Sequence, residues 1–435
     1  MTTDTRPTAT DRPVTRTTCA VVGGGPAGMI LGLLLARAGV AATVLEKHSD
    51  FLRDFRGDTV HPTTLALLDD LGLFERFDAL PQSKIRRVQV PAADGGLVAV
   101  ADFTRLPLRH PYIAMVPQWD LLDLLADAGR EEAAFDLRMR HEVTGVVRES
   151  GRVVGVDHTS PDGPGRLLAD LVVACDGRWS VVRCDVGLPI HELPVRMDVW
   201  WFRVPTQRAL PEALLPRVGA RAAVIAIPRE GYVQVAYIGR KGTDAQLRAR
   251  GIEAFRAEIA SALPELADDV AGVATMDEVK HLDVRVDRLR RWHAPGVLCL
   301  GDAAHAMSPV GGVGINLAVQ DAVATARLLA GPLVSGIDPT QVDRVLPRVR
   351  RRRLMPTVLT QAMQRVLHAQ FIERVLDGRL SEFPSRLPDV MRRMPALAAV
   401  PAFGVGVGVR PERAPDWARR RATSDRSPSP AVAAH

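Results

Sequence analysis

The stretch of residues 299–321 constrains this chain more than any other, because it reads as strand, loop and helix in immediate succession. An apolar run over residues 296–300 ends on Gly301-Asp302, and a proline and three glycines separate this pair from a segment with helical spacing. Such a segment delivers one carboxylate to the edge of a sheet and then presents a bare loop at a helix N-terminus. This arrangement suits a polyol or phosphate chain laid across the end of the sheet.

A glycine-rich turn near the start of the chain has the same character. Residues 19–22 are apolar enough for a short strand, and Gly23, Gly25 and Gly28 follow with the spacing G-x-G-x-x-G. The first glycine permits a tight turn, the second lets a pyrophosphate approach the backbone, and the third lets helix and strand pack closely. Residues 26–38 then have helical spacing, and a helix N-terminus offers free N–H groups to phosphates.

An acidic residue follows this turn where a ribose ligand would need it. Residues 40–45 form a second predicted strand that ends at Glu46. The Glu46 carboxylate can accept hydrogen bonds from a ribose diol. The whole pattern predicts dinucleotide binding, and the alternative is a tight structural turn in a Rossmann-like sheet with an empty crevice.

Length and composition bound the remaining possibilities. At 435 residues the chain is too long for one ordinary core, so two closely joined domains are expected. The net charge of +6 is compatible with a nucleic-acid partner, but the 56 basic residues are nearly all arginines, which is typical of coding bias, so we expect none. The four cysteines lack metal-ligand spacing, which predicts a reduced cytoplasmic protein without a bound metal. No apolar run reaches membrane-spanning length, so no membrane span is expected.

In the middle of the chain the sequence pattern changes to a series of short predicted strands. Residues 199–204, 222–227 and 232–238 read as strands, and the last of them alternates between apolar and polar residues. They predict a second, mostly antiparallel sheet inserted between two parts of the first domain.

Prolines set the expected helix boundaries in the last third of the chain. A helix that begins at Asn316 is expected to stop at Gly331-Pro332. Residues 341–376 read as helices interrupted near Pro347 and Pro356.

A third turn, Asp176-Gly177, follows an apolar strand and lies between the other two turns in the sequence. With the three motifs in this order, residues 17–370 resemble the p-hydroxybenzoate hydroxylase-like (class A) FAD-dependent aromatic hydroxylases, a family of flavoprotein monooxygenases. The motifs are specific only together. The chain resembles the shorter members, because no part of it matches the thioredoxin-like domain of the longer phenol hydroxylases. It also has no second G-x-G-x-x-G, which fits a nicotinamide cofactor that visits transiently in this family.

The resemblance and the change of sequence pattern together predict an α/β fold, in which a Rossmann-like FAD-binding domain carries an inserted, mostly antiparallel substrate-binding sheet and C-terminal helices. The expected division is a disordered tail over 1–17, the FAD-binding domain over 18–80, 116–188 and 291–335, a substrate-domain hairpin over 81–115, the substrate domain over 189–290, a helical region over 336–418 and a disordered tail over 419–435.

The resemblance implies roles for residues that contact the nucleotide. Glu46 is expected to hold the adenosine ribose, and Arg56 and Gln118 are expected to contact the flavin nucleotide. The residues themselves support Arg56, because Arg56-Gly57 reads as an exposed turn from which a guanidinium can reach a pyrophosphate in bidentate geometry. The competing interpretation is an ordinary surface arginine.

The other two turns are expected to hold the middle and the flavin end of FAD. By the same resemblance, Asp176-Gly177 structures the site and helps NAD(P)H engage, and Asp302 binds the ribityl or pyrophosphate groups. The loop that starts at Pro309 lies against the isoalloxazine ring, where the helix N-terminus stabilises a reduced, anionic flavin. The complete predicted set of cofactor-binding residues is Gly23, Gly25, Pro26, Ala27, Gly28, Glu46, Lys47, Arg56, Gln118, Asp176, Gly177, Gly301, Asp302, Pro309, Gly311, Gly312, Val313, Gly314, Ile315 and Asn316.

The activity that the resemblance implies is insertion of one oxygen atom from O2 into an aromatic or polyketide-like small molecule. NADPH or NADH reduces the FAD, O2 adds at the flavin C4a position as a hydroperoxide, and no protein side chain performs the redox step. Arg203, Tyr232 and Tyr237 are candidate substrate contacts, with strand packing as the competing interpretation. His305 is expected to pack or cap the loop at the flavin edge rather than to take part in catalysis.

Other activities of the same scaffold remain open at this point. They are a halogenase, a reductase, a cyclase whose FAD only shapes the pocket, and a non-catalytic nucleotide-binding protein. Residues 200–205 loosely resemble the Trp-x-Trp-x-Ile-Pro signature of flavin-dependent halogenases, but Phe202 and Val204 are mismatches, so an ordinary strand is the preferred interpretation. His48 and His61 flank Arg56, and a covalent bond from either to the flavin is a minor alternative.

Overall fold

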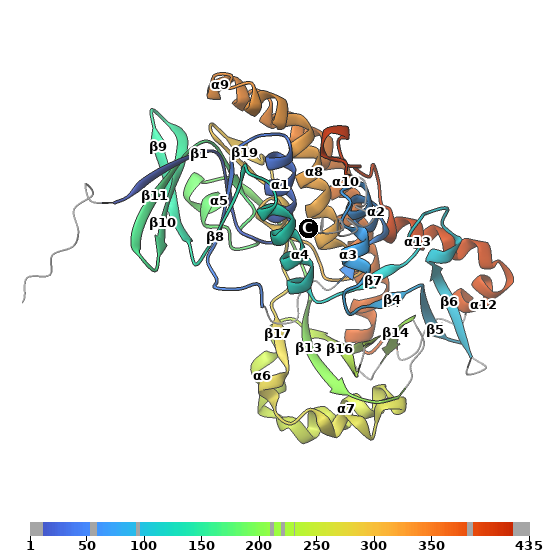
Figure 1. Cartoon of the computed structure of the whole chain (residues 1–435). Helices are drawn as coiled ribbons and strands as arrows, with labels where there is room; N and C mark the ends of the chain where they lie inside the picture. Colours follow the sequence, from blue (N-terminus) through green and yellow to red (C-terminus); the bar gives the residue numbers. More distant parts are fainter. Residues whose placement is uncertain are drawn as a thin grey trace, which may run out of the picture.

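The computed structural model describes residues 12–52, 59–92, 96–208, 213–218, 222–229, 231–380 and 386–420, and an eight-stranded sheet forms the centre of its first domain (Figure 1). The strand order along this sheet is β19-β20-β11-β1-β2-β8, and β10 and β9 continue from β11. The strands are β1 (Val14–Val22), β2 (Ala42–Glu46), β8 (Phe135–Met139), β9 (Glu142–Glu149), β10 (Arg152–Ser160), β11 (Gly163–Ala174), β19 (His293–Ala294) and β20 (Val297–Cys299).

The central strands of this sheet are parallel and end level with one another. Val22 at the end of β1 pairs with Leu45 in β2 and with Ala174 in β11, and Ala174 pairs in turn with Cys299 at the end of β20. These strand ends are nearly continuous runs of buried Val, Leu, Ala and Cys, as expected where helices cover both faces of a parallel sheet. The residues that follow the four strands therefore emerge side by side at one edge.

Helices flank the sheet and extend beyond it. Helix α1 packs against α8 and α4, and α10 packs against α8 on the side of the C-terminal segment (Figure 1). The helices are α1 (Pro26–Arg37), α2 (Pro62–Asp70), α3 (Phe74–Asp78), α4 (Gln118–Arg130), α5 (Val181–Val186), α6 (Asp244–Ala249), α7 (Gly251–Ala262), α8 (Val313–Val334), α9 (Pro339–Asp343), α10 (Leu346–Leu367), a π-helical segment η6 (His368–Ile372), α11 (Glu373–Leu376), α12 (Arg386–Arg393) and α13 (Ala399–Gly406).

The predicted inserted sheet is present and has seven strands in the order β17-β13-β16-β15-β14-β5-β6. All of its pairings are antiparallel except the one between β14 and β5, and the hairpin of β5 and β6 extends it. The strands are β5 (Arg87–Pro91), β6 (Leu97–Asp102), β13 (Met197–Pro205), β14 (Ala213–Val218), β15 (Ala223–Pro228), β16 (Tyr232–Arg240) and β17 (Lys280–Leu282). Two small sheets join the domains: β3 (Thr59–Val60), β4 (Ser83–Ile85) and β7 (Ile113–Met115) form one, and β12 (Ile190–Leu193) and β18 (Val286–Leu289) form the other.

The two faces of the inserted sheet have different neighbours. On its outer face, Phe202, Val235 and Tyr237 pack against Phe255 and Ile259 of α7. Its inner face, which consists of Val199, Trp201, Ile225, Ala236 and Ile238, packs against η6, α11 and Val310 of the loop before α8. The inner face is therefore the one that meets the FAD-binding domain.

At both ends of the described chain, residues that were predicted to belong to disordered tails are part of the folded domain. Strand β1 begins at Val14 and pairs with β11 from there, so residues 14–17 belong to the sheet and not to a disordered segment. The β-branched residues of this stretch suit a strand. At the other end, the Arg420 N–H donates to the Asp70 carbonyl, so the last described residues of the predicted 419–435 tail are held by the domain.

Two predicted helix interruptions are wrong. Helix α8 continues through Gly331-Pro332 to Val334, and α10 continues through Pro356, while Pro347 lies in its first turn. Proline is tolerated in a first turn because that N–H has no partner within the helix. At Pro356, which is buried in α10, tertiary packing outweighs the lost hydrogen bond, whereas Pro332 lies near the end of α8 and is only half-buried.

Helix α8 also corrects the expectation that no apolar segment reaches membrane-spanning length. Among the described residues it is the helix long and apolar enough to cross a membrane, with 22 residues. However, 72% of its most apolar window is buried inside the protein, as in the core helix of a globular domain.

Candidate functional site

The predicted motifs meet at the carboxyl edge of the central sheet. Gly23 follows β1 and adopts a left-handed φ of +101°, and a Cβ at this position would lie 2.6 Å from the Cys175 carbonyl oxygen. Gly28 approaches the backbone of the turn as closely, because a Cβ there would lie 2.0 Å from the Gly23 oxygen. The glycine turn and the Asp176-Gly177 turn can therefore lie side by side only if these positions lack side chains.

Glu46 occupies the next position along this edge. Its carboxylate is 7% exposed and accepts hydrogen bonds from the Gly24 N–H at 2.9 Å and the His48 N–H at 3.0 Å. These bonds hold the carboxylate beside the glycine turn, where a ribose would lie. Lys47, which follows it, is exposed.

The Asp176 side chain has an unsatisfied acceptor. Its Oδ2 accepts from the Val182 N–H in the first turn of α5 at 3.3 Å, while its buried Oδ1 has no hydrogen-bond partner among the described residues. Burial raises the pKa of Asp176, although the Ser180 hydroxyl and nearby backbone N–H groups act in the opposite direction. A buried acceptor without a partner is costly, so this oxygen fits a site whose ligand brings a donor.

Asp302 lies beside the same turn. It receives a hydrogen bond from Arg178, whose Nη2 is 3.3 Å from its Oδ2, and its side chain remains 30% exposed. The open space at Gly25, where a Cβ would meet no atom within 4 Å, lies at the N-terminus of α1. The residues at this edge thus fit a dinucleotide, with N–H groups and open space at the glycine turn and carboxylates at the ribose and polyol positions.

The loop before α8 is fixed from the side of β3 and α2. Gly312 caps α8 in a left-handed conformation, and its carbonyl accepts from the Thr59 hydroxyl at 2.8 Å and lies 3.0 Å from His61 Nε2. Burial lowers the pKa of His61 to about 4, so its imidazole is neutral. In the first turn of α8, Asn316 Oδ1 accepts from the hydroxyls of Thr63 and Thr64 at 2.7 and 2.8 Å.

A buried ionic cluster lies behind the Gly301-Asp302 turn. Asp321 of α8 is fully buried and contacts His305 Nε2 at 2.5 Å and Arg353 Nε at 2.9 Å. Burial alone would raise the pKa of Asp321, but the charges and hydrogen bonds of His305 and Arg353 hold it below its usual value. Since His305 is 1% exposed, its position agrees with packing of the loop.

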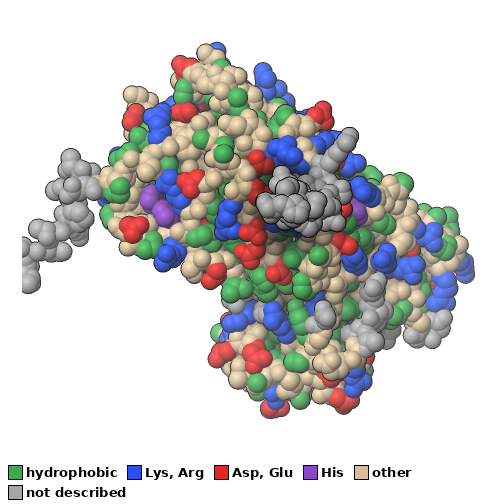
Figure 2. Space-filling model, viewed as in Figure 1, with side chains coloured by type: hydrophobic (Ala, Val, Ile, Leu, Met, Phe, Trp, Pro, Cys, Tyr) green, Lys and Arg blue, Asp and Glu red, His purple; other side chains and the backbone are tan. Residues whose placement is uncertain are grey.

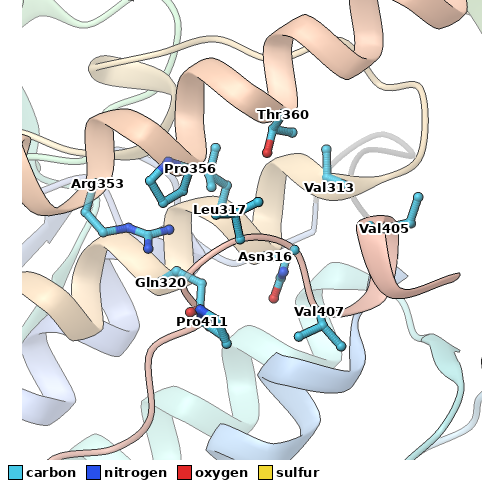
Figure 3. Close-up of a pocket in the computed structure, with 13 residues that line it drawn as sticks. Val313, Asn316, Leu317, Gln320, Arg353, Pro356, Thr360, Val405, Val407 and Pro411 are labelled. Carbon is cyan, nitrogen blue, oxygen red and sulfur yellow. The ribbon is translucent and has the colours of Figure 1, made fainter. Parts of the chain in front are cut away.

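A hollow opens beside the first turns of α8 (Figure 3). It has about 350 Å³ of space not filled by atoms, part of it open to solvent, and lies between α8, α10 and the C-terminal segment. Asn316 and Gln320 project toward it from α8, Arg353 and Thr360 from α10 (Figure 3). Two of the residues that line it, Val313 and Asn316, belong to the predicted cofactor-binding set.

The remaining predicted residues fall in different places. Arg56 lies outside the described residues. Gln118 is the first residue of α4 and partly buried, so a contact from it to the flavin remains a prediction. The alternative of a covalent flavin bond gains nothing from the structure, because His48 is exposed and His61 is buried against Gly312.

The three residues predicted to contact the substrate lie on different faces of the inserted sheet. The Arg203 guanidinium lies 4.9 Å from the ring centre of Tyr232, at the end of the inner face. Tyr237 points to the outer face, where it packs against Phe255 and donates a hydrogen bond to Glu258 at 2.8 Å. The position of Tyr237 agrees with the competing interpretation of strand packing, and its contact with a substrate stays a prediction.

Comparison with known proteins decides the family. Residues 16–343 match the family described as an FAD binding domain. The chain belongs to this family. With monooxygenases among its relatives, the protein is an FAD-dependent oxidoreductase.

Individual relatives of this flavoprotein agree with that assignment. It is 35% identical over 320 residues to 6-methylpretetramide 4-monooxygenase from Streptomyces rimosus, covering 72% of this chain and 75% of that one. It is similar to the OxyS anhydrotetracycline hydroxylase structure from Streptomyces rimosus, with a TM-score of 0.68, 25% identity and 92% and 77% of the two chains covered. A probable FAD-dependent monooxygenase, pqsL from Pseudomonas aeruginosa, shares the fold with a TM-score of 0.70, 21% identity and 84% and 99% coverage.

Several residues that shape this flavoprotein's site were not anticipated from the sequence. Thr59 and His61 hold the Gly312 carbonyl, and Gln364 and His368 of the C-terminal helices hold the loop before it. Gln364 lies in a helix that also carries a run of arginines, so no local signal in the sequence distinguishes it from the other polar residues of α10.

Proposed function

We propose that this flavoprotein is an NAD(P)H-consuming monooxygenase that inserts one oxygen atom of O2 into an aromatic or polyketide-like small molecule. The observation that carries the proposal is the apposition of the FAD edge and the apolar inner face of the inserted sheet, which meet at Val310. The similarity to 6-methylpretetramide 4-monooxygenase supports a fused-ring aromatic substrate. NAD(P)H supplies two electrons, one oxygen atom replaces hydrogen on the substrate as a hydroxyl group, and the other leaves as water.

The bound flavin activates oxygen, while the protein positions the substrate and keeps water out of the site. Trp201, Ile225 and Ala236 offer an apolar surface on which a planar ring can lie, and burial there excludes water that would divert the reduced cofactor to H2O2. Arg203 and Tyr232 lie at the end of this face and remain the proposed polar contacts of the substrate.

A docking surface for NAD(P)H lies beside Asp302. The Trp179 side chain is 61% exposed, and the Arg285 guanidinium stacks on its ring 3.9 Å from the centre. Arg178 joins this pair to Asp302. An exposed π surface with adjacent cations suits a nucleotide base and its phosphates.

Other partners and locations have less support. On the face shown in Figure 2, Lys and Arg side chains are interspersed with Asp and Glu, which does not favour a nucleic-acid surface. The cysteines Cys19, Cys175, Cys184 and Cys299 are free, which suits a reducing compartment, so we place the protein in the cytoplasm.

The test uses the purified full chain with FAD, NADPH or NADH, and a panel of phenols and fused-ring polyketides under 18O2. The proposal expects substrate-stimulated NAD(P)H oxidation and one 18O atom in the product. Halogenated product without label, cyclised product without NAD(P)H consumption, or a reduced substrate would each contradict it. Protein that stays colourless with excess FAD would contradict the cofactor assignment itself.

A further inference from the structure

Three buried polar side chains of α10 and η6 face the loop between Asp302 and α8. They are Gln361, Gln364 and His368, which are 1%, 1% and 6% exposed. Helix α10 runs beside α8 (Figure 1), and these side chains approach the loop from α10 and η6. Gln361 Nε2 donates to the carbonyl of Asp287 at 2.8 Å and to that of Ala306 at 3.4 Å, at the start of the loop.

Gln364 uses its whole amide group on the loop. Its Nε2 donates to the carbonyls of Ser308 at 2.8 Å and Val310 at 2.9 Å, and its Oε1 accepts from the Ser308 N–H at 3.3 Å. One buried side chain therefore fixes the carbonyls on both sides of Pro309 and the N–H group of Ser308. Such backbone groups would otherwise be satisfied by water, which would let the loop take other conformations.

His368 completes the arrangement through Ser308. Its Nε2 lies 2.9 Å from the Ser308 hydroxyl oxygen, which also accepts from the Val310 N–H at 3.2 Å. Burial lowers the pKa of His368, while Glu373 opposes this, so the ring is neutral near pH 7. A neutral ring can accept the hydroxyl proton of Ser308 and keep the hydroxyl oxygen free to accept from Val310.

The same segment also contributes to the substrate face. His368 begins η6, and Phe371 and Ile372 of η6 pack against the cluster that contains Trp201 and Val310. A π-helical segment inserts an extra residue into a helix turn and is common at functional sites. Here it brings a polar contact to the flavin loop and an apolar contact to the substrate face within five residues.

We propose that Gln364 and His368 are positioning residues that hold residues 308–310 in one conformation between the flavin and the inner face. This proposal rests on the proposed function, because the loop's position determines whether oxygen reaches the substrate or is lost as H2O2. Neither residue touches the reacting atoms. Their effect is on the coupling of NAD(P)H oxidation to product formation.

The test compares Gln364→Met, which keeps the side-chain volume but removes both donors and the acceptor, with Ser308→Ala, a smaller change that removes the contact to His368. Gln370→Leu is the matched control, because Gln370 lies in η6 but is exposed. Hydrogen–deuterium exchange of the full chain, with and without FAD, reports on the loop directly. We expect exchange in residues 306–312 to rise by about tenfold in Gln364→Met and less in Ser308→Ala, and to stay unchanged in Gln370→Leu.

The second readout is coupling, measured as product formed per NAD(P)H oxidised together with the H2O2 released. We expect coupling to fall by about threefold or more in Gln364→Met, with the KM of NAD(P)H unchanged. Unchanged exchange in both variants would overturn the proposal, and so would faster exchange with normal coupling. If the wild-type protein oxidises none of the panel, the proposed function fails, while the exchange measurement still decides whether these residues hold the loop. If Gln364→Met does not fold, Ser308→Ala decides both readouts.

Discussion

The fully buried carboxylate of Asp321 gives the most quantitative prediction, for the variant Asp321→Asn. The substitution keeps the size of the side chain but removes the charge that compensates Arg353, whose remaining acceptors are the Arg410 carbonyl at 3.2 Å and Glu412 at 3.9 Å. Breaking a buried ion pair by removing one partner costs about 3–5 kcal/mol. We expect the free energy of unfolding of the FAD-binding domain to fall by that amount.

The expected shift in melting temperature follows from the size of the protein. With about 2.1 cal/mol/K of unfolding entropy per residue, a chain of 435 residues loses about 4 °C in its apparent midpoint for about 4 kcal/mol. The assay is thermal unfolding followed by circular dichroism, with Asp416→Asn as control because that side chain is 99% exposed. A shift of Asp321→Asn no larger than the control's would refute the reasoning.

The direction in which the stability difference between wild type and Asp321→Asn changes with pH can be stated. The folded protein holds the pKa of Asp321 below its usual value, so its contribution to stability is complete above the unfolded pKa of about 3.9 and is lost as the pH falls through the folded value. The part of the stability difference between wild type and Asp321→Asn that comes from the titration of Asp321 itself should therefore be lost only below about pH 4. A difference that has already disappeared at pH 5 would contradict this assignment of charge.

Three further substitutions test separate parts of the site. Gly25→Val should abolish FAD binding without unfolding the protein, because the position has an ordinary negative φ and open space that the pyrophosphate would fill, and a visible spectrum with a melting curve would check both. Trp179→Ala should raise the KM for NAD(P)H by about tenfold in steady-state kinetics while FAD affinity stays unchanged, and a normal KM would contradict the docking surface. Tyr237→Phe should cost about 1 kcal/mol of stability through the lost bond to Glu258 but leave substrate KM unchanged, whereas a raised KM would return this residue to the substrate site.

The meeting of the predicted motifs at one edge of the sheet could be foreseen because each motif directly follows a short apolar strand. In a parallel sheet the residues after neighbouring strands must meet at one edge, so Gly23, Glu46, Asp176 and Asp302 could be brought together without knowledge of the packing. Alternation along β16 could also have separated two candidates, because Tyr232 and Tyr237 are an odd number of residues apart and so lie on opposite faces.

The contacts of the buried ionic cluster behind the Gly301-Asp302 turn could not be predicted in this way. Asp321, Arg353 and Glu412 meet across three segments that are far apart in the sequence, and each residue alone reads as a surface charge. The tolerance of α10 for Pro356 likewise depends on its burial against α8, which local spacing does not reveal.

The position of β1 between β2 and β11 has a consequence for how the protein matures. Strand β1 occupies the middle of the sheet, but its neighbour β11 and the β20 turn that supplies Asp302 are synthesised much later than β1. A nascent chain that stops before residue 300 lacks one wall of the nucleotide cradle. Uptake of the yellow cofactor should therefore require synthesis through the β20 turn and mark the completion of the central sheet.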